Sequence, residues 1–365
     1  MRTEELDYDL PEGRIAQTPV EPRDSARLLV DRGWGNAPGD DVVASLPDQL
    51  DEGDVVVLND TRVLPARVAV TRSTGGSGEV LLLNEAGPPS NGWWEALCRP
   101  SRKMGPGSEV TSAGGRLSFE MGEDLGAGRR LVRPQVVGAT QTNLGHDRHR
   151  LLDALEADGV MPLPPYITEA LSDPERYQTT YAARPGSAAA PTAGLHITER
   201  LLAELRNRGV SVRTVELVVG LDTFRPVTTE HVESHEIHTE FYSVSEQTWH
   251  DVTTARVAGS KVLAVGTTTV RALESVAHMG DLAGHTDLFI TPGFDFRVVD
   301  RLMTNFHLPR SSLLALVEAF VGPRWRDFYA HALESDYRFL SFGDAMLLSR
   351  AQPGGSSSRL PEEAR

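Results

Sequence analysis

The stretch "KVLAVGTTTVRALESVAHMG", residues 261–280, joins a strand pattern directly to a helix pattern. Its first part, "KVLAV", is a short apolar, β-branched run that predicts a buried strand. From Gly266 onward the sequence predicts a helix, and Gly280 can end that helix in a left-handed conformation. A strand that leads at once into a helix is the repeating unit of α/β proteins, so this stretch indicates the fold class.

The same alternation continues on both sides. The run "DVVVL" at 54–58 predicts another buried strand, and "NDTR" after it predicts a polar turn. Further strands are predicted at 210–220 and 286–293, and helices at 197–208, 246–258 and 311–322. Gly209 can cap the first of these helices. Strands that alternate with helices predict a mainly parallel sheet, which is open or closed into a barrel.

The segment from Arg67 to Val137 differs from the rest of the chain in its composition and in the length of its apolar runs. Its glycines are frequent, and its apolar runs, such as "EVLLL" and "RLSFE", are short and separated by turn signals. Short strands at close spacing predict a small antiparallel barrel or sandwich. We therefore expect an inserted all-β domain at 67–149 within a discontinuous α/β domain formed by 1–66 and 150–350. The low-complexity tail at 351–365 predicts disorder.

Composition and charge narrow the function classes. The 365 residues carry a net charge of −15, which argues against a general nucleic-acid coat protein but leaves room for a local basic groove. Cys98 is the only cysteine, so no intrachain disulfide is possible. No stretch approaches the roughly 20 apolar residues that span a bilayer, and the acidic N-terminus lacks the apolar core of a signal peptide. We expect a cytoplasmic protein without membrane contact.

Two polar stretches have two interpretations each. At "GTTT", free backbone N–H groups and the helix dipole favour an anion, although an ordinary capped turn has the same pattern. Arg271 in the first turn of this helix is expected to have an anionic partner. In "HVESHEIHTE" (231–240), His231 and His235 are four residues apart, which suits a metal on a helix. The order differs from the zinc-protease motif, so a polar lining that meets a ligand is the favoured interpretation.

Three further stretches place polar groups beside predicted elements. "NDTRVLPAR" (59–67) follows a buried strand, where α/β sheets bind ligands, or it forms a salt-bridged hinge between domains. "TNFHLPRSSL" (304–313) precedes an apolar helix, where a lone histidine is more often structural than catalytic. "AAAPTAGLHIT" (188–198) contains only small side chains before His196. It predicts either a ligand floor with a histidine at its rim or a tight contact between strand and helix.

No strong nucleophile is evident. The G-x-S-x-G elbow of serine hydrolases is absent from the sequence, and Cys98 has no histidine close by in the chain. The pattern therefore favours an enzyme that positions its reactants without forming a covalent link to them.

Several of these stretches together resemble one family. The chain contains, in the same order as that family, the motifs "NDTRVLPAR", "PLPPYI", "YQTTYA", "PGSAAAPTAGLHIT", "HVESHEIHTE", "VGTTTVRALES", "TPGFDFRVVDRLMTNFHLPRSSLLALVEAF" and "YRFLSFGDAMLL". This series is similar to the S-adenosylmethionine:tRNA ribosyltransferase-isomerase family of queuosine biosynthesis. The likeness runs from about Leu6 to Leu348, is weak in the β-rich insert and is absent from the tail.

The resemblance implies an α/β, barrel-like catalytic domain that carries an inserted all-β domain. It implies transfer and isomerisation of the ribosyl moiety of S-adenosylmethionine onto 7-aminomethyl-7-deazaguanine at the tRNA wobble position. The products would be epoxyqueuosine-tRNA, adenine and methionine. The implied partners are S-adenosylmethionine and the anticodon region of tRNA, with no metal, no further cofactor and no obligate protein partner. The basic stretch at 99–107 either follows the tRNA backbone or is a solvated hairpin.

The resemblance also suggests roles for residues in the matched motifs. The candidate bases are His196, His238 and His307, with His196 preferred, and Glu240 or Glu274 as alternatives. The candidate contacts to phosphate or carboxylate are Arg62, Arg67, Arg225 and Arg271. The other expected substrate contacts are Asn59, Thr61, Ala190, Pro191, Thr192, Gly194, Gly266, Thr267, Thr268, Asn305 and Phe306.

One stretch departs from the family pattern. The family usually has L-H-V-G-x-G-T-F where this chain has "LVVGLDTF" (217–224), so Val218 replaces a histidine and Asp222 replaces a glycine. A second interpretation follows from this difference. The chain would then be a paralogue that binds tRNA or S-adenosylmethionine with altered or lost activity.

Overall fold

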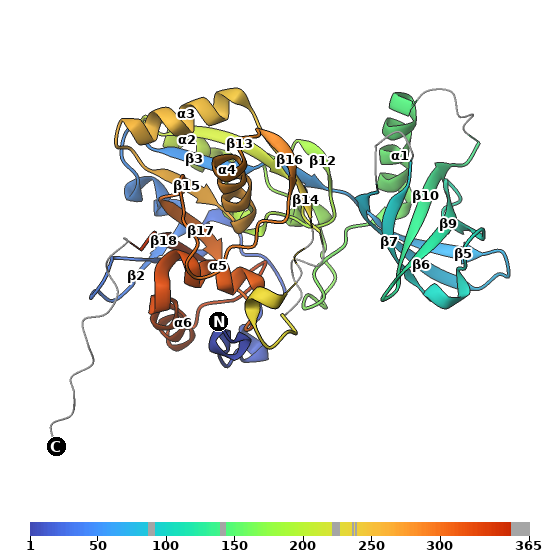
Figure 1. The fold of residues 1–365 in the computed structure, drawn as a ribbon, viewed down its shortest axis with the longest axis horizontal. Coiled ribbons are helices and arrows are strands. Elements are labelled where there is room, and N and C mark those ends of the chain that lie inside the picture. The colour runs from blue at the N-terminus through green and yellow to red at the C-terminus, as the bar shows by residue number, and fades with distance from the viewer. Residues whose placement is uncertain (87–91, 139–143, 221–226, 236, 238, 352–365) are drawn as a thin grey trace, which may run out of the picture.

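The computed structural model describes residues 1–86, 92–138, 144–220, 227–235, 237 and 239–351. Figure 1 shows two bodies joined at a narrow waist. The larger body is built on an extended sheet with helices, and the smaller one is a β-barrel with one helix beside it. The expected fold class, an α/β domain with an inserted antiparallel barrel, is therefore confirmed. Within the described residues, no helix is long and apolar enough to cross a membrane.

Nine strands among the described residues form the large sheet. In spatial order they are β16 (Ala283–Thr286), β14 (Glu240–Val244), β13 (Ser211–Leu217), β3 (Val55–Asn59), β15 (Val262–Val265), β17 (Arg301–Asn305), β18 (Ala345–Ser349), β1 (Arg27–Val30) and β2 (Gly39–Val42). The four strands from β13 to β17 run parallel. β14, β16 and β2 pair antiparallel with their neighbours, and so do β17 and β18. The sheet is thus mixed and open, whereas the alternation of elements predicted a mainly parallel one.

Helices cover both faces of this sheet. α4 (Thr267–Met279), α3 (Glu246–Val257), α5 (Ser312–Val321) and α6 (Trp325–Glu334) contribute to the apolar core on one face. α2 (Glu199–Asn207) contributes to the core on the other face. The β3 run supplies both, because Val55 and Val57 point to one side and Val56 and Leu58 to the other. A strand buried on both faces has to be continuously apolar, which is the pattern of "DVVVL".

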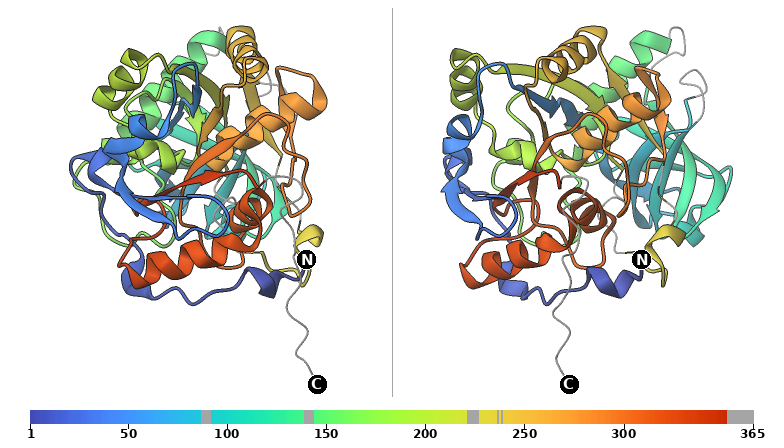
Figure 2. Two further views of the ribbon diagram at one scale, coloured as in Figure 1. Left: turned by 90° about the vertical axis from the view of Figure 1, so that its left-hand side faces the viewer. Right: turned by 60° about the vertical axis from the view of Figure 1, so that its left-hand side comes forward.

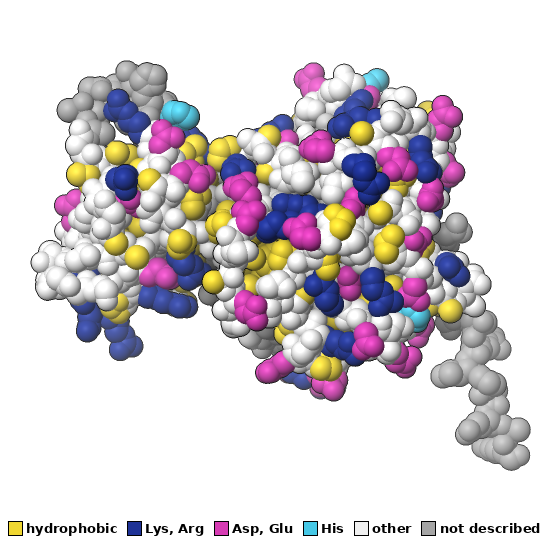
Figure 3. Space-filling view, turned by 180° about the vertical axis from the view of Figure 1, so that it is seen from behind, with side chains coloured by type: hydrophobic (Ala, Val, Ile, Leu, Met, Phe, Trp, Pro, Cys, Tyr) yellow, Lys and Arg dark blue, Asp and Glu magenta, His cyan; other side chains and the backbone are white. Residues whose placement is uncertain are grey.

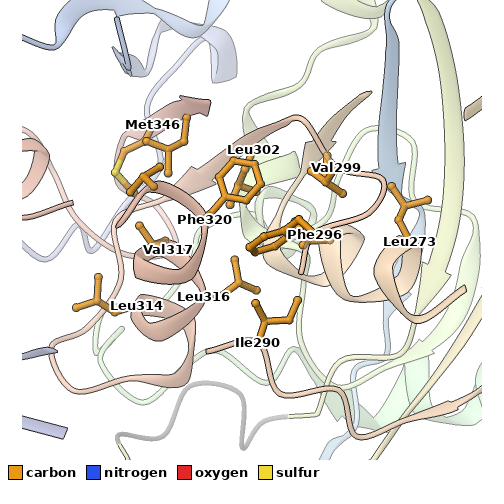
Figure 4. Close-up of a cluster of buried hydrophobic side chains, with 14 of the residues drawn as sticks. Leu273, Ile290, Phe296, Val299, Leu302, Leu314, Leu316, Val317, Phe320 and Met346 are labelled. Carbon is orange, nitrogen blue, oxygen red and sulfur yellow. The ribbon is translucent and has the colours of Figure 1, made fainter. Parts of the chain in front are cut away.

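The core beside α5 is aromatic. Figure 4 shows Phe320 of α5 facing Phe296, with Leu316 and Ile290 below them. The two phenylalanine rings lie edge to face with their centroids 5.0 Å apart. Ser311 caps α5, because its side chain accepts a hydrogen bond from the Leu314 N–H. The N-terminal segment runs along α5 and α6 (Figure 2), where the Tyr8 hydroxyl donates to the His307 carbonyl at 2.5 Å.

The smaller body is a closed antiparallel barrel. Within the described residues its six strands are β5 (Arg67–Arg72), β6 (Ser77–Glu85), β7 (Trp94–Arg99), β10 (Arg129–Val136), β9 (Leu117–Gly126) and β8 (Glu109–Ser112), closed by pairing of β5 with β8. β11 (Gly159–Val160) extends β5, and α1 (Leu144–Asp158) packs Leu155 into the barrel core. These contacts favour an end of the inserted unit after Val160 rather than after residue 149. The division into domains itself stays a prediction.

Shorter elements complete the chain. β4 (Thr61–Val63) pairs with β12 (Arg184–Ser187). The 3₁₀ helices are η1 (Thr3–Leu6), η2 (Glu12–Arg14), η3 (Arg23–Ser25), η4 (Val43–Gln49), η6 (Ser101–Lys103), η7 (Pro174–Tyr177), η8 (Thr192–His196), η10 (Val232–Ser234) and η11 (Gly322–Arg324). The tail at 352–365, predicted to be disordered, lies outside the described residues.

The predicted helices are confirmed to within two residues at each end, and Gly280 does end α4 with a left-handed φ of 88°. Two predictions are wrong. The strand predicted at 286–293 is instead β16 at Ala283–Thr286, because the chain then turns away and the carbonyls of Thr286 and Leu288 accept hydrogen bonds from Arg271. The "NDTR" turn is not a simple turn, since Asn59 ends β3 and β4 begins at Thr61.

Candidate active site

A pocket lies at the carboxyl ends of the parallel strands β13, β15 and β17. Its empty volume is about 610 Å³, including the open solvent at its mouth. The carboxyl edge of parallel strands is where α/β folds bind ligands. The lining residues are Tyr166, Ala190, Pro191, Thr192, Ala193, Val219, Gly266, Thr267, Thr268, Thr304, Asn305, Phe306, His307, Leu308, Ser311, Leu313, Leu340 and Ser341. We call this the first pocket.

The small residues form one wall of the first pocket. Gly266, between β15 and α4, has a φ of 91°, a conformation that favours glycine. A Cβ added to Gly266 would lie 3.8 Å from the Cβ of Ala193, so the two segments approach closely there. The tract 190–193 therefore keeps the pocket open by lacking bulk. Gly194 does not, because a Cβ added to it would come within 2.1 Å of the Tyr181 hydroxyl. The tract thus has an open pocket wall on one side and a tight contact with Tyr181 on the other.

A side-chain amide positions the polar end of the first pocket. The Oδ1 of Asn305 accepts a hydrogen bond from the Thr192 hydroxyl at 2.9 Å, and its Nδ2 faces Nε2 of His196 at 3.4 Å. His196 is buried and lines a smaller neighbouring pocket with Arg23 and Arg176. Burial, together with the charges of nearby arginines, lowers the pKa of His196 to about 4. The imidazole thus stands behind Asn305, and among the described residues it does not line the first pocket.

His307 is the histidine that does line the first pocket. Its Nε2 lies 3.0 Å from the Thr304 hydroxyl, and its backbone N–H donates to the Tyr329 hydroxyl at 2.9 Å. The Tyr8 hydroxyl binds its carbonyl. Burial lowers the pKa of His307 to about 3, so the ring is neutral at neutral pH. A neutral imidazole at a pocket wall can accept a proton or hold a hydrogen bond.

Glu240 and Arg271 meet in a second pocket. Their side chains form a buried ion pair, and both line a cavity with an empty volume of about 520 Å³, open solvent included. Arg271 thus has the anionic partner expected from its place in the first turn of α4. Burial lowers the pKa of Arg271 to about 10, which leaves the guanidinium charged at neutral pH. We call this the second pocket.

Other predicted residues lie away from the two pockets. Asn59 is fully buried and braces the sheet, with Nδ2 donating to the Leu217 carbonyl at 2.9 Å and to the Thr268 hydroxyl at 3.3 Å. Thr61 is buried in β4. Arg62 pairs with Glu175 at 2.9 Å, and Arg67 pairs with Glu79 of the barrel at 3.1 Å.

The alternative acid–base and nucleophilic groups have structural surroundings. Glu274 accepts hydrogen bonds from the backbone N–H groups of 297, 298 and 299, which fixes it in the core behind α4. Cys98 is buried in the barrel core, and burial raises its pKa to about 11. Its thiol is therefore protonated at neutral pH and unsuited to attack. His238, Arg225 and Asp222 lie outside the described residues.

Several residues that line the first pocket were not selected from the sequence. Tyr166 lines the first pocket and hydrogen-bonds Ser341 at 2.7 Å, and Leu313 borders both pockets. Val219 lines the first pocket, and its neighbour Val218 donates its N–H to the Phe241 carbonyl. "PLPPYI" and "YRFLSF", among the matched motifs, contain the first two of these residues. Their presence there is the signal that could have identified Tyr166 and Ser341.

The metal interpretation of 231–240 gains no support from the described residues. Among them, no group of three or more His, Cys, Asp or Glu side chains is placed to hold a metal ion. His231 forms an isolated bridge with Arg2, and the His235 ring lies edge to face with Phe289 at 6.0 Å. The expectation that the protein needs no metal stays a prediction.

Comparisons with known proteins extend over the whole molecule. S-adenosylmethionine:tRNA ribosyltransferase-isomerase of Rubrobacter xylanophilus is 49% identical over 349 residues, which cover 95% of this chain and 98% of that protein. The protein of the same name from Moorella thermoacetica is 46% identical, over 95% of this chain and 100% of its own. The crystal structure of S-adenosylmethionine tRNA ribosyltransferase from Thermotoga maritima superposes with a TM-score of 0.53 at 34% identity, over 94% of this chain and 99% of that one.

The family assignment follows from these matches. The family model described as "Queuosine biosynthesis protein" matches residues 3–348, which include both bodies and both pockets. This chain belongs to the queuosine biosynthesis protein family.

Proposed function

We propose that this protein transfers and isomerises the ribosyl moiety of S-adenosylmethionine onto 7-aminomethyl-7-deazaguanine at the wobble position of tRNA. Epoxyqueuosine-tRNA forms, and adenine and methionine leave. One observation supports this most. Motifs that are far apart in the sequence, among them "PGSAAAPTAGLHIT", "VGTTTVRALES" and "TNFHLPRSSL", contribute their small and polar residues to a single pocket. Both full-length relatives carry the name of this activity.

The first pocket suits a nucleoside. Ligand pockets commonly enclose 300–1,000 Å³, with apolar walls and a few convergent polar groups. Here Pro191, Val219 and Phe306 supply apolar surface, while Thr192 and Asn305 supply hydrogen-bonding groups. No Asp, Glu, Lys or Arg is among the described residues that line it. A neutral pocket of this kind accepts a purine and a ribose more readily than a phosphate.

The reaction requires that both reactants are held in the correct positions and that a group of the protein accepts a proton. The positive sulfur of S-adenosylmethionine acidifies the adjacent 5′ carbon of the ribose, so loss of a proton there gives an ylide. The aminomethyl nitrogen of the tRNA base then forms a bond to the ribosyl group and loses a proton. The ribosyl bonds to adenine N9 and to the sulfur break, so adenine leaves with a proton and methionine leaves as the neutral thioether. Correct placement of two reactants can supply about 7–11 kcal/mol of the barrier. We assign the proton acceptor to His307, because it alone of the candidate histidines in the described residues lines the first pocket.

The barrel offers a surface for tRNA. Arg99, Arg102 and Lys103 follow one another at the η6 turn, are exposed, and form no ion pair with another described residue. Several other arginines of the barrel are paired with carboxylates, as Arg116 is with Asp158 and Arg133 is with Glu120. Figure 3 shows Lys and Arg side chains gathered at the lower end of this body.

The unpaired charge at η6 favours a phosphate backbone as its partner. We therefore infer that the barrel holds the anticodon region while the wobble base reaches the first pocket. A tRNA substrate also implies a cytoplasmic location, with no further protein partner required.

One assay tests the function. The full chain is incubated with S-adenosylmethionine labelled in the ribose and with tRNA that carries 7-aminomethyl-7-deazaguanine. Adenine release together with label retained on the tRNA supports the proposal. Saturable binding without release would instead indicate the non-catalytic paralogue. Val218 is not among the described residues that line either pocket.

A further inference from the structure

The two pockets share walls. Leu313 of α5 lines both, and its neighbours Ser311 and Ser312 line the first and the second pocket respectively. On the opposite segment, Val219 lines the first pocket and Gly220 lines the second. One elongated ligand can therefore occupy both cavities and pass beside Leu313. S-adenosylmethionine has that form, because its adenosine and its methionine are joined at the sulfonium.

The second pocket combines apolar surface with one buried pair of opposite charges. Leu288, Ile290 and Leu316 supply apolar walls. Figure 4 shows Ile290 directly below Leu316 of α5. Glu240 is 5% exposed and Arg271 is 7% exposed, so neither charge is screened well by solvent. A buried ion pair costs desolvation and is weak evidence for stability, which suggests a role beyond holding the fold.

The geometry of the pair is fixed by the backbone. Arg271 donates from Nε to the Leu288 carbonyl at 3.0 Å and from an η nitrogen to the Thr286 carbonyl at 3.5 Å. Its other η nitrogen donates to Glu240, and Glu240 also accepts from the Gly220 N–H at 3.2 Å. A guanidinium has five N–H groups, so these three bonds leave two donors among the described residues. A cation and an anion thus stand in fixed positions side by side at the wall of one cavity.

Such a wall discriminates by charge pattern. A ligand with a single charge would be attracted to one partner and repelled by the other. An α-amino acid carries a carboxylate and an ammonium on the same carbon, and it can satisfy both at once. The apolar walls beside the pair suit an unbranched thioether side chain.

We propose that the second pocket binds the methionyl part of S-adenosylmethionine, with the α-carboxylate on Arg271 and the α-ammonium on Glu240. The sulfonium then lies beside Leu313, and the ribose lies in the first pocket near His307. The proposal rests on the proposed function for the identity of the whole substrate. It adds the subsite for the amino-acid end, where released methionine would also be held as a zwitterion.

The first test changes the ligand and leaves the protein intact. Isothermal titration calorimetry of the full chain without tRNA compares L-methionine with 3-(methylthio)propylamine, which lacks the carboxylate, and 4-(methylthio)butanoate, which lacks the ammonium. We expect each analogue to bind at least about tenfold more weakly than methionine, equivalent to about 1.4 kcal/mol. Binding of either analogue within twofold of methionine would overturn the proposal.

The second test changes the protein. Arg271→Lys keeps the positive charge but removes the planar guanidinium, which can hold both oxygens of a carboxylate. It should raise the inhibition constant of the product methionine at least about tenfold. Arg324→Lys is the matched control, because Arg324 forms another buried pair, with Asp31 at 2.6 Å, and lines neither pocket among the described residues. An unchanged inhibition constant in folded Arg271→Lys would contradict the assignment.

A third variant covers the case in which Arg271→Lys does not fold. A Cβ added to Gly220 meets no atom of the described residues within 4 Å, so Gly220→Val places bulk at the pocket wall with its Cβ clear of them. It should weaken methionine binding while adenine binding is preserved, and equal weakening of both would count against a separate subsite. The calorimetry needs no ribosyl transfer, so failure of the labelled transfer assay and failure of this proposal are separate results.

Discussion

The Nδ2 atom of Asn305 lies 3.4 Å from Nε2 of His196, and Asn305 stands between that imidazole and the first pocket. The same amide accepts the Thr192 hydroxyl on the pocket side. We therefore expect His196 to act on a ligand through the orientation of Asn305. We expect a positioning residue here, whereas the sequence motif predicted the preferred base.

His196→Ala is expected to leave the fold intact and to lower turnover by about 10²-fold, the order of loss that follows when a reacting group is misplaced by an ångström. His196→Gln should restore part of the activity, because its amide oxygen can accept the Asn305 N–H. The measurement is single-turnover ribosyl transfer with kcat and KM separated. Unchanged turnover in His196→Ala would remove this residue from the mechanism, and failure of glutamine to rescue would exclude the positioning role.

The two buried histidines predict acid sensitivity of the fold. The unfolded chain binds a proton at each of them near pH 6.5, whereas the folded protein keeps His196 neutral to about pH 4 and His307 to about pH 3. Below pH 6.5 the unfolded state thus binds more protons, so the free energy of unfolding falls as the pH falls. Each histidine contributes a slope of about 1.4 kcal/mol per pH unit between pH 6 and 4.5.

Urea denaturation of His307→Gln at a series of pH values checks this slope. The variant should lose about 1.4 kcal/mol per pH unit of the dependence shown by the unaltered protein over the same window. The comparison uses the slope, so a general loss of stability in the variant does not affect it. Equal slopes in the two proteins would show that His307 is protonated in the folded state at these pH values.

Much of the fold could be predicted from local sequence patterns. The α4 segment and its end at Gly280 followed from a strand, a helix and a glycine that adopts a positive φ. Antiparallel neighbours could not be predicted in the same way. β14 and β16 are antiparallel because the chain returns across the sheet edge, and their pairing partners are remote in sequence. The strand predicted at 286–293 failed because a side chain, Arg271, takes the carbonyls that a sheet would use.

The sequence could predict which segments form the site, but it could predict less well what each residue of those segments does. Small residues at 190–193 and the "GTTT" junction both reach the first pocket, as their chemistry suggested. The sequence could not show that Asn305 lies between His196 and the pocket, because the two residues are 109 positions apart in the chain. For Arg62 and Arg67, the sequence could not reveal the carboxylates that pair with them, since Glu175 and Glu79 belong to separate elements.

The glycine at 194 predicts a steric effect that its neighbours do not share. A Cβ at this position would meet the Tyr181 hydroxyl at 2.1 Å and a Thr179 methyl at 3.0 Å, so Gly194→Ala should destabilise the protein by about 1–3 kcal/mol. Gly105→Ala is the control, because a Cβ there has no atom within 4 Å. Thermal denaturation of both variants measures the difference. A Gly194→Ala protein as stable as the control would show that Tyr181 moves aside at little cost.

The η6 turn predicts how tRNA binding responds to salt. Replacing Arg102 and Lys103 together with alanine removes two exposed cations that have no carboxylate partner in the described part of the chain. The affinity for tRNA should fall, and the dependence of log Kd on log salt should become shallower by about one to two units, because fewer counterions are released. KM for S-adenosylmethionine should stay the same, since neither residue lines a described pocket.

The control for this prediction is Arg133→Ala, which removes an arginine of the same barrel that is already paired with Glu120 at 2.8 Å. Its salt dependence should match that of the unaltered protein. Filter binding of precursor tRNA at 50–300 mM KCl gives both slopes. If the double variant and the control give the same slope, the η6 cations do not contact phosphate, and the tRNA must approach another face of the molecule.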